Sequence, residues 1–238
     1  MSRPVVLKAV IFDMDGVIID SHPAHRDAWR MFLRTVGKAV SDAELDFILD
    51  GRKREEILRH FLGELSEVEV RQYGERKDEI FKQQSLQTRL IPGVIDLLAE
   101  LQNAGIAMAI ATSASESRAR HTLDQLQLAE RFDVVVTGDD VARSKPDPSI
   151  YGLTCRRLNV APGSSVAIED AVSGIQAARA AGLTCIGVAV HQSRDQLRKA
   201  GAAHVVENLL DLSLAKLQGL LPRRHGRLTS RTMVMSVR

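Results

Sequence analysis

Two aspartates stand two residues apart in the segment Asp13-Met14-Asp15-Gly16, directly after the apolar run Ala9–Phe12. If that run is a buried strand, both carboxylates lie at its carboxyl end, where they repel each other and lose hydration. A bound divalent cation would compensate for both effects. Because an Asp-x-Asp pair is also common in ordinary turns, the interpretation depends on what the rest of the chain supplies.

Three further polar motifs follow apolar runs. They are Thr112-Ser113, Lys145 in the segment Lys-Pro-Asp-Pro, and Glu169-Asp170. Alone, each has an ordinary explanation as a helix cap, a surface lysine or a solvated turn. In an open parallel sheet, however, the carboxyl ends of the strands form the ligand crevice. The four motifs together therefore predict one site that combines carboxylates, a hydroxyl and an ammonium group.

A doubly wound α/β sheet is the arrangement that would bring these motifs together. Short runs rich in Val, Ile and Ala predict buried parallel strands at residues 5–12, 106–112, 132–137, 166–169 and 185–189. Amphipathic segments predict helices at residues 94–104, 117–128, 149–158 and 173–181. Gly105 and Gly182 follow two of these helices, where helix ends favour glycine. Alternation of strand and helix indicates a parallel sheet covered on both faces.

Residues 21–86 interrupt this alternation with apolar residues at helical spacing, and Ser41 with Glu44 forms a capping box. We interpret this region as a helical cap of residues 21–87, inserted into an α/β core of residues 1–20 and 88–221. The chain crosses between the two parts near residues 20 and 88. A helical module beside the end of the first strand is placed to act as a lid.

Composition excludes several classes of protein. The chain has 238 residues, 45% of them hydrophobic, and no apolar run long enough to span a bilayer. The net charge of +2 depends on five arginines in residues 222–238, and the rest of the chain carries 27 basic and 30 acidic residues, a net charge of −3. We therefore expect a mildly acidic body with a mobile basic tail, and no nucleic-acid or membrane partner. No P-loop or Gly-x-Gly-x-x-Gly motif follows a strand.

The two cysteines, Cys155 and Cys185, are too few for a disulfide scaffold, and buried packing is expected for both. No signal-peptide pattern is visible at the start of the sequence. These features favour a cytoplasmic location, and the expected state is a monomer.

In this order, the four motifs resemble those of the haloacid dehalogenase superfamily of phosphotransferases. The resemblance covers residues 5–212 and is to the branch with a helical cap, in particular to β-phosphoglucomutase and related phosphatases. It implies that Asp13 is the nucleophile that becomes an aspartyl-phosphate, and that Asp15 is the general acid and then the general base. Mg²⁺ is the implied cofactor, with oxygen ligands from Asp13, Asp170 and the Asp15 carbonyl, and from Glu169 directly or through water.

The resemblance also assigns residues to the substrate. Thr112 would donate its hydroxyl and Ser113 its backbone amide to the phosphate, while Lys145 would pair with Asp13 and the phosphate oxygens. The implied substrate-binding residues are Gly16, His25, Trp29, Arg54, Lys77, Ser113, Ala114 and Ser115. For the residues in the cap, ordinary interpretations stay open: Trp29 as a core residue, His25 as a surface histidine, and residues 52–54 as a solvated basic face.

Two positions depart from the mutase pattern. Glu116 replaces a lysine beside the expected place of a second phosphate, and Ala171 follows Asp170 where serine is usual. The leading prediction is therefore a Mg²⁺-dependent phosphatase acting on a small phosphorylated metabolite, such as a sugar phosphate. The alternative is a β-phosphoglucomutase that interconverts β-glucose 1-phosphate and glucose 6-phosphate.

Two other classes fit less well. A signalling receiver domain also places aspartates, threonine and lysine at the carboxyl edge of a parallel sheet, but its phosphorylated aspartate lies outside the acidic pair and no helical insert is expected. A binding protein without catalysis is disfavoured because all four motifs keep chemically competent side chains.

Overall fold

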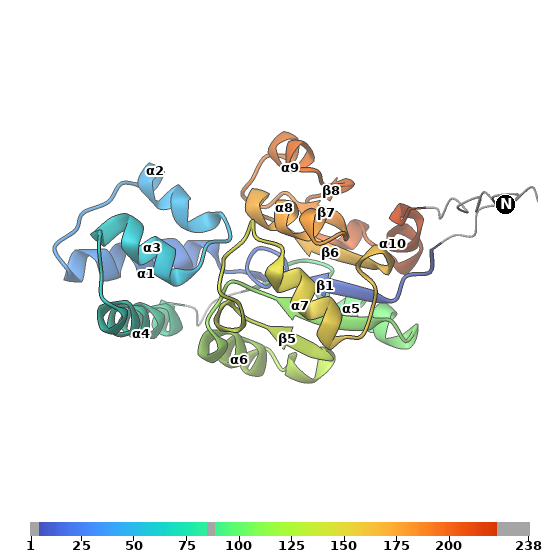
Figure 1. The fold of residues 1–238 in the computed structure, drawn as a ribbon, viewed down its shortest axis with the longest axis horizontal. Coiled ribbons are helices and arrows are strands. Elements are labelled where there is room, and N and C mark those ends of the chain that lie inside the picture. The colour runs from blue at the N-terminus through green and yellow to red at the C-terminus, as the bar shows by residue number, and fades with distance from the viewer. Residues whose placement is uncertain (1–4, 85–88, 223–238) are drawn as a thin grey trace, which may run out of the picture.

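The computed structural model describes residues 5–84 and 89–222, and its centre is a six-stranded parallel sheet (Figure 1). The strands follow the order β5-β4-β1-β6-β7-β8 across the sheet. Their bounds are Ala9–Phe12 (β1), Ala107–Ala111 (β4), Val134–Val136 (β5), Ser165–Glu169 (β6), Thr184–Val188 (β7) and His204–Val206 (β8). The predicted α/β fold is confirmed. The sequence analysis missed only β8 among these strands, because its three residues form too short an apolar run.

Strand β1 lies between β4 and β6, so the strands that lead into three of the motifs are direct neighbours. Phe12 at the end of β1 pairs with Ile110 of β4 and with Ile168 of β6. The next residue, Asp13, donates its backbone N–H to the Ile168 carbonyl at 2.9 Å. Because all three strands are parallel, the side chains that follow them meet at one edge of the sheet.

Helices cover both faces of the sheet, as the apolar strands require. Helices α5 (Val94–Asn103), α6 (Glu116–Gln125) and α10 (Leu214–Leu220) contribute to one hydrophobic cluster, together with Val10 and Phe12 of β1. Helices α7 (Ser149–Arg157), α8 (Val172–Ala180) and α9 (Arg194–Ala200) contribute to the cluster on the other face, together with Ile11. Alternate residues of β1 thus point into opposite layers.

The region between the first two core strands is helical in its described part, as predicted. It contains α1 (His22–Thr35), α2 (Asp42–Leu45), the short 3₁₀ helix η1 (Asp46–Leu49), α3 (Arg54–Leu62) and α4 (Glu67–Gln84). These helices lie together beyond one end of the sheet in Figure 1 and share a third hydrophobic cluster, which includes Trp29 and Phe32. The predicted capping box is present, because the Glu44 N–H donates to Ser41 Oγ at 3.3 Å and the Ser41 N–H donates to Glu44 Oε2 at 2.8 Å.

A two-stranded antiparallel ribbon joins the helical region to the sheet. Its strands are β2 (Ile19–Asp20) and β3 (Arg89–Leu90), with Ile19 paired to Leu90 and Asp20 paired to Arg89. Both strands are too short to be recognised in the sequence. They lie close to the positions where the sequence predicts the two chain crossings, although residues 85–88 are outside the described part.

The expectations from composition also concern the two cysteines, membrane-spanning helices and the basic tail. Cys155 and Cys185 are buried and free, which agrees with the predicted packing role. Within residues 5–84 and 89–222, no helix combines the length and the apolar character that crossing a membrane requires. The predicted mobile tail lies outside the described residues except for Pro222.

Candidate active site

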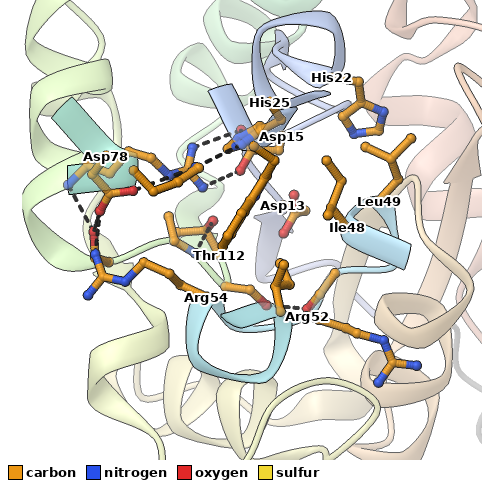
Figure 2. A pocket seen from close by; sticks show the side chains of 18 of the residues that line it. Asp13, Asp15, His22, His25, Ile48, Leu49, Arg52, Arg54, Asp78 and Thr112 are labelled. Carbon is orange, nitrogen blue, oxygen red and sulfur yellow. Dashed lines mark hydrogen bonds and ion pairs between the residues drawn. The ribbon is translucent and has the colours of Figure 1, made fainter. Parts of the chain in front are cut away.

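A cavity of about 80 Å³ lies between the carboxyl ends of the central strands and the helices α1, α3 and α4 (Figure 2). Most of the side chains predicted from the sequence line it: Asp13, Asp15, His25, Trp29, Arg54, Lys77, Thr112, Ser113, Ala114, Ser115, Glu169 and Asp170. Two predicted residues do not line it. Lys145 lies beneath the carboxylates of Asp13 and Glu169. Gly16 contributes a left-handed backbone conformation rather than a side chain.

Lys145 is buried at the base of the site and bridges two carboxylates. Its Nζ lies 2.6 Å from Asp13 Oδ1 and 2.5 Å from Glu169 Oε1, and it donates to the Ala111 carbonyl at 3.1 Å. The sequence predicted the contact with Asp13 but not the contact with Glu169. Burial alone would lower the pKa of Lys145, but the attraction of Asp13 and Glu169 outweighs it and raises that pKa, so the lysine is charged.

The carboxylates of Asp13, Glu169 and Asp170 form a buried acidic cluster. Each offers one oxygen, and these oxygens all lie within 4.8 Å of one another. Burial raises the pKa of Asp13 well above its usual value, and the charges of Glu169 and Asp170 raise it further, while Lys145 opposes this. One lysine balances three carboxylates only in part, so the cluster has excess negative charge. A set of carboxylate oxygens with excess negative charge fits Mg²⁺, a hard cation that prefers oxygen ligands.

Glu169 is fixed from several sides. The Tyr151 hydroxyl donates to its Oε1 at 2.6 Å, and the Asp170 N–H donates to its Oε2 at 3.2 Å. Gly174, in the first turn of α8, allows this arrangement, because an added Cβ would lie 2.1 Å from the Glu169 carboxylate. Glycine at this position therefore lets the helix approach a buried carboxylate.

Gly16 allows a similarly close approach on the other side of the cluster. Its φ of +78° is in the left-handed region, and a Cβ there would lie 2.1 Å from Asp170 Oδ2. The same Asp170 oxygen lies 3.1 Å from His22 Nε2 but accepts no well-aligned hydrogen bond from the described residues. An under-satisfied, buried carboxylate oxygen beside two other carboxylates is a further reason why the site fits a cation.

Asp15 faces the cavity beside Asp13 and is held by three partners. Its Oδ1 accepts from Ser21 Oγ at 2.6 Å and lies 3.3 Å from His25 Nε2. The guanidinium of Arg118 pairs with both carboxylate oxygens, at 3.0 Å and 2.5 Å. Burial would raise the pKa of Asp15, but Arg118 and His25 together hold that pKa well below its usual value. Asp15 is thus ionised in this state.

Arg118 is the main site residue that the sequence analysis missed. It lies on α6, is 6% exposed, and its guanidinium carbon is 5.3 Å from the centre of the Phe81 ring. The register of α6 contains the signal. Ser115 is the N-cap of this helix, and residues 115 and 118 lie on the same face, so a residue three positions after the cap also reaches the cavity.

His25 and Lys77 form a polar chain that ends on Asp15. Lys77 Nζ lies 3.2 Å from His25 Nδ1, and His25 Nε2 points to Asp15. Burial and the neighbouring charge of Lys77 lower the pKa of His25 to about 3, so we assign a neutral ring that accepts from Lys77 and donates to Asp15. The His25 side chain is only 13% exposed, unlike that of an ordinary surface histidine. Its ring stacks on Phe81, with the ring centres 4.3 Å apart.

The ordinary interpretation of Trp29 as a core residue is confirmed, and its assignment to the substrate stays a prediction. The side chain is 2% exposed and belongs to the hydrophobic cluster of the helical region, and it also lines the cavity. Its ring lies 5.2 Å from Lys77 Nζ, a cation–π contact.

Three basic residues in a row, 52–54, have different environments. Arg54 lines the cavity and pairs with Asp78 of α4 (Figure 2). The guanidinium of Arg52 points away from Asp13 and pairs with Asp50 and Glu56. Lys53 Nζ donates to the Val141 carbonyl of the core at 2.5 Å. The interpretation of residues 52–54 as a single solvated face is therefore wrong.

The loop of residues 50–53 also contacts the motif after β4 and the start of α8. Ser113 Oγ donates to the Gly51 carbonyl at 2.5 Å, and Ser173 Oγ donates to the Asp50 carbonyl. Thr112 Oγ1 accepts from the Ala114 N–H at 3.1 Å. In this structure the helical region thus lies against the core over the cavity.

Glu116, which the sequence analysis predicts beside a second phosphate, does not line the cavity. The residue is the first of α6, is exposed, and pairs with Arg120 one turn later at 2.8 Å. Its charge therefore faces solvent on the outer side of the helix. The charged residue that α6 does direct into the cavity is Arg118, which is positive.

Comparison with known proteins agrees with this geometry. The family model described as haloacid dehalogenase-like hydrolase matches residues 10–188. The chain is 36% identical to the phosphorylated carbohydrates phosphatase of Thermotoga maritima, over 84% of this chain and 94% of the relative. It is 32% identical to the beta-phosphoglucomutase of Bacillus subtilis, over 89% of this chain and 94% of the relative. The crystal structure of CbbY from Rhodobacter sphaeroides in complex with phosphate superimposes with a TM-score of 0.79 at 30% identity, covering 89% of this chain and 99% of CbbY.

Proposed function

Since the chain belongs to the haloacid dehalogenase-like hydrolase family and is an enzyme of its phosphatase and phosphoglucomutase group, we propose that it is a Mg²⁺-dependent phosphatase. It transfers the phosphoryl group of a small phosphorylated metabolite, a sugar phosphate, to water through an aspartyl-phosphate on Asp13. The observation that carries this proposal is the acidic cluster of Asp13, Glu169 and Asp170 over Lys145, in a cavity that also presents Asp15.

The proposed reaction has two phosphoryl transfers. In the first, a carboxylate oxygen of Asp13 bonds to phosphorus while the ester P–O bond breaks, and a protonated Asp15 gives its proton to the leaving alkoxide. In the second, water attacks phosphorus, Asp15 accepts its proton, and the acyl-phosphate bond to Asp13 breaks. The ionised Asp15 of this structure has the form that the second step requires.

Mg²⁺ fits the acidic cluster, and the proposed ligands are the carboxylates of Asp13 and Asp170, the Asp15 carbonyl, and Glu169 directly or through water. When bound, the ion would reduce the repulsion between the anionic nucleophile and the anionic phosphate. Lys145 holds Asp13 in place, and the Thr112 hydroxyl and the Ser113 amide are proposed phosphate donors.

The proposed cap is the helical region of residues 21–87, and the proposed core comprises residues 1–20 and 88–221. Support for this division comes from the separate hydrophobic cluster of the helices and from the short β2–β3 ribbon that connects the two parts. A cavity lined from both parts would exclude water once the cap lies against the core.

The test of the proposed function is a phosphate-release screen over phosphorylated sugars, sugar alcohols and other small phosphate esters, with Mg²⁺ and with EDTA. We expect Mg²⁺-dependent release from at least one sugar-type ester. Release that EDTA leaves unchanged would contradict the metal assignment, and no release from any ester would contradict the phosphatase assignment.

A β-phosphoglucomutase is the second candidate, and two observations favour keeping it. His25, Trp29, Arg54 and Lys77, which the mutase resemblance assigns to the substrate, all line the cavity, and Glu116 is exposed and pairs with Arg120. Incubation with β-glucose 1-phosphate distinguishes the two candidates. Rapid formation of glucose 6-phosphate with little free phosphate would support the mutase.

Mg²⁺ is expected to stabilise the fold as well as to support activity. At a concentration 100 times its dissociation constant, a ligand that binds only the native state adds about 2.7 kcal/mol. For a chain of this size that corresponds to a rise in melting temperature of roughly 5–10 °C. Thermal unfolding with and without Mg²⁺ measures this shift. The Asp170→Asn variant should lose most of it, while Asp195→Asn, on exposed helix α9, should keep it. An equal shift in Asp170→Asn would exclude Asp170 as a ligand.

Substrate affinity is expected to fall at alkaline pH because of Lys77. Burial, with help from Arg118 and Arg54, lowers the pKa of Lys77 to about 8, against the opposing attraction of Asp78 and Asp15. Lys77 is therefore charged below this pH, and KM for an anionic substrate should rise as the pH increases through about 8. In Lys77→Arg the side chain stays charged at alkaline pH, so KM should no longer rise through pH 8. In the control Lys82→Arg, on the same helix, KM should rise as in the unmodified enzyme. Identical pH profiles for Lys77→Arg and the unmodified enzyme would contradict the role of Lys77.

A further inference from the structure

Asp78 is a carboxylate placed where the substrate's non-reacting end is expected to bind. It extends from α4 to the side of the cavity that lies away from Asp13 (Figure 2). Its Oδ2 accepts from Ser115 Oγ at 3.0 Å and pairs with Arg54, and its Oδ1 lies 3.6 Å from Lys77 Nζ. These three partners are among the side chains that the sequence resemblance assigns to the substrate.

The side chain of Asp78 is 13% exposed and is surrounded mainly by positive groups. Burial would raise the pKa of Asp78, but Lys77, Arg54 and Arg118 together lower that pKa, so the carboxylate is ionised at neutral pH. Asp78 thus occupies the donors of Arg54 and Ser115 with a negative charge that belongs to the protein itself.

We propose that Asp78 determines substrate specificity, because it partly neutralises Arg54 and Lys77 at the end of the cavity away from Asp13 and so selects phosphate monoesters whose remaining part is uncharged and rich in hydroxyl groups. This inference rests on the proposed phosphatase function. It adds that a second phosphate or a carboxylate at the far end of the substrate is disfavoured.

The charges of the cavity support this selection. On the side of Asp78, the positive groups Arg54, Lys77 and Arg118 face two carboxylates, Asp78 and Asp15, so one positive charge remains. The phosphate that reacts at Asp13 already brings negative charge into the same enclosed space. A second anionic group would have to approach Asp78 at short range, where like charges in a partly buried site repel strongly. Hydroxyl groups, in contrast, can donate to Asp78 and accept from Arg54 without added charge.

The test compares two esters that differ in one group. D-Sorbitol 6-phosphate and D-gluconate 6-phosphate share the same carbon chain and phosphate position, but carbon 1 is a hydroxymethyl in the first and a carboxylate in the second. We expect kcat/KM to be higher for sorbitol 6-phosphate by about tenfold or more. In Asp78→Asn this ratio should fall by about tenfold, mostly through a lower KM for gluconate 6-phosphate, because the distal group is bound alike before and during the reaction.

Glu79→Gln is the matched control. It removes the same charge from the next position of α4, but Glu79 is exposed and pairs with Lys82 outside the cavity. This variant should keep the substrate ratio of the unmodified enzyme. Circular dichroism and thermal unfolding establish that both variants are folded.

The outcomes separate this inference from the proposed function. If the unmodified enzyme hydrolyses gluconate 6-phosphate or a sugar bisphosphate better than the matching neutral monoester, the inference is overturned while the phosphatase function stands. The same conclusion follows if Asp78→Asn is folded and active but keeps the original ratio. If no ester releases phosphate at all, the proposed function fails, and the inference fails with it.

Discussion

Replacement of Asp13 by asparagine is expected to reduce phosphate release by on the order of 10⁴-fold or more without loss of the fold. The amide is nearly the same shape as the carboxylate, but it is neutral and cannot form the acyl-phosphate. Other groups of the site would remain, because Lys145 keeps its contact with Glu169 and Asp15 keeps its contact with Arg118. The residual rate of phosphate release should therefore be that of a site that still positions the substrate but has no nucleophile at residue 13.

The same substitution should leave stability unchanged or increase it in the absence of metal. Burial raises the pKa of Asp13, so the ionised carboxylate is less favourable in the folded than in the unfolded chain at neutral pH. Asparagine removes this unfavourable charge from a cluster in which one lysine faces three carboxylates. A fall in activity together with an unchanged or higher melting temperature distinguishes a lost nucleophile from a misfolded enzyme.

Phosphate release, thermal unfolding and detection of the phosphorylated protein by mass spectrometry measure these effects. Asp27→Asn is the matched control, because Asp27 is an exposed carboxylate on α1 that pairs with Arg30. It should change neither rate nor phosphorylation. If Asp13→Asn retained more than about a tenth of the activity, the nucleophile would have to be another residue.

The positions of the main motifs were predictable because backbone topology alone determines them. Asp13, Thr112 and Asp170 follow strands that the apolar runs reveal, and parallel strands bring their carboxyl ends to one edge whatever the side chains around them. Of the helical region, its α-helical character and the capping box at Ser41 could be predicted for the same reason, since both depend on local sequence.

The partners of the site side chains could not be predicted in the same way. Arg118 pairs with Asp15 across 103 positions of sequence, and Asp78 meets Arg54 and Ser115 only because the fold brings α4 within side-chain reach of the starts of α3 and α6. Such contacts depend on tertiary packing. The direction of the Glu116 side chain depends on where its helix begins. With the helix expected to begin at residue 117 rather than 116, the outward direction of its first side chain was not visible.

Replacement of Lys145 by methionine is expected to destabilise the protein by about 3–5 kcal/mol, because it removes the ammonium group that pairs with the buried carboxylates of Asp13 and Glu169. Lys145 and Glu169 are almost completely buried, and Nζ contacts Asp13 and Glu169 at 2.6 Å and 2.5 Å. For a chain of this size the melting temperature should fall by roughly 10 °C or more. Lys199→Met is the control, because Lys199 is an exposed residue of α9. This variant should keep the melting temperature of the unmodified protein.

The cause of this loss can be separated from a simple packing defect by pH and by a second substitution. Without Lys145, the pKa of Asp13 should rise further, because the lysine is the group that lowers it. The folded state then binds protons more readily than the unfolded state, so the destabilisation should be smaller at pH 5 than at pH 8. Adding Glu169→Gln should restore part of the stability, because it removes one of the unpaired charges. A loss that is equal at both pH values and unchanged by Glu169→Gln would show that Lys145 acts through packing rather than through its charge.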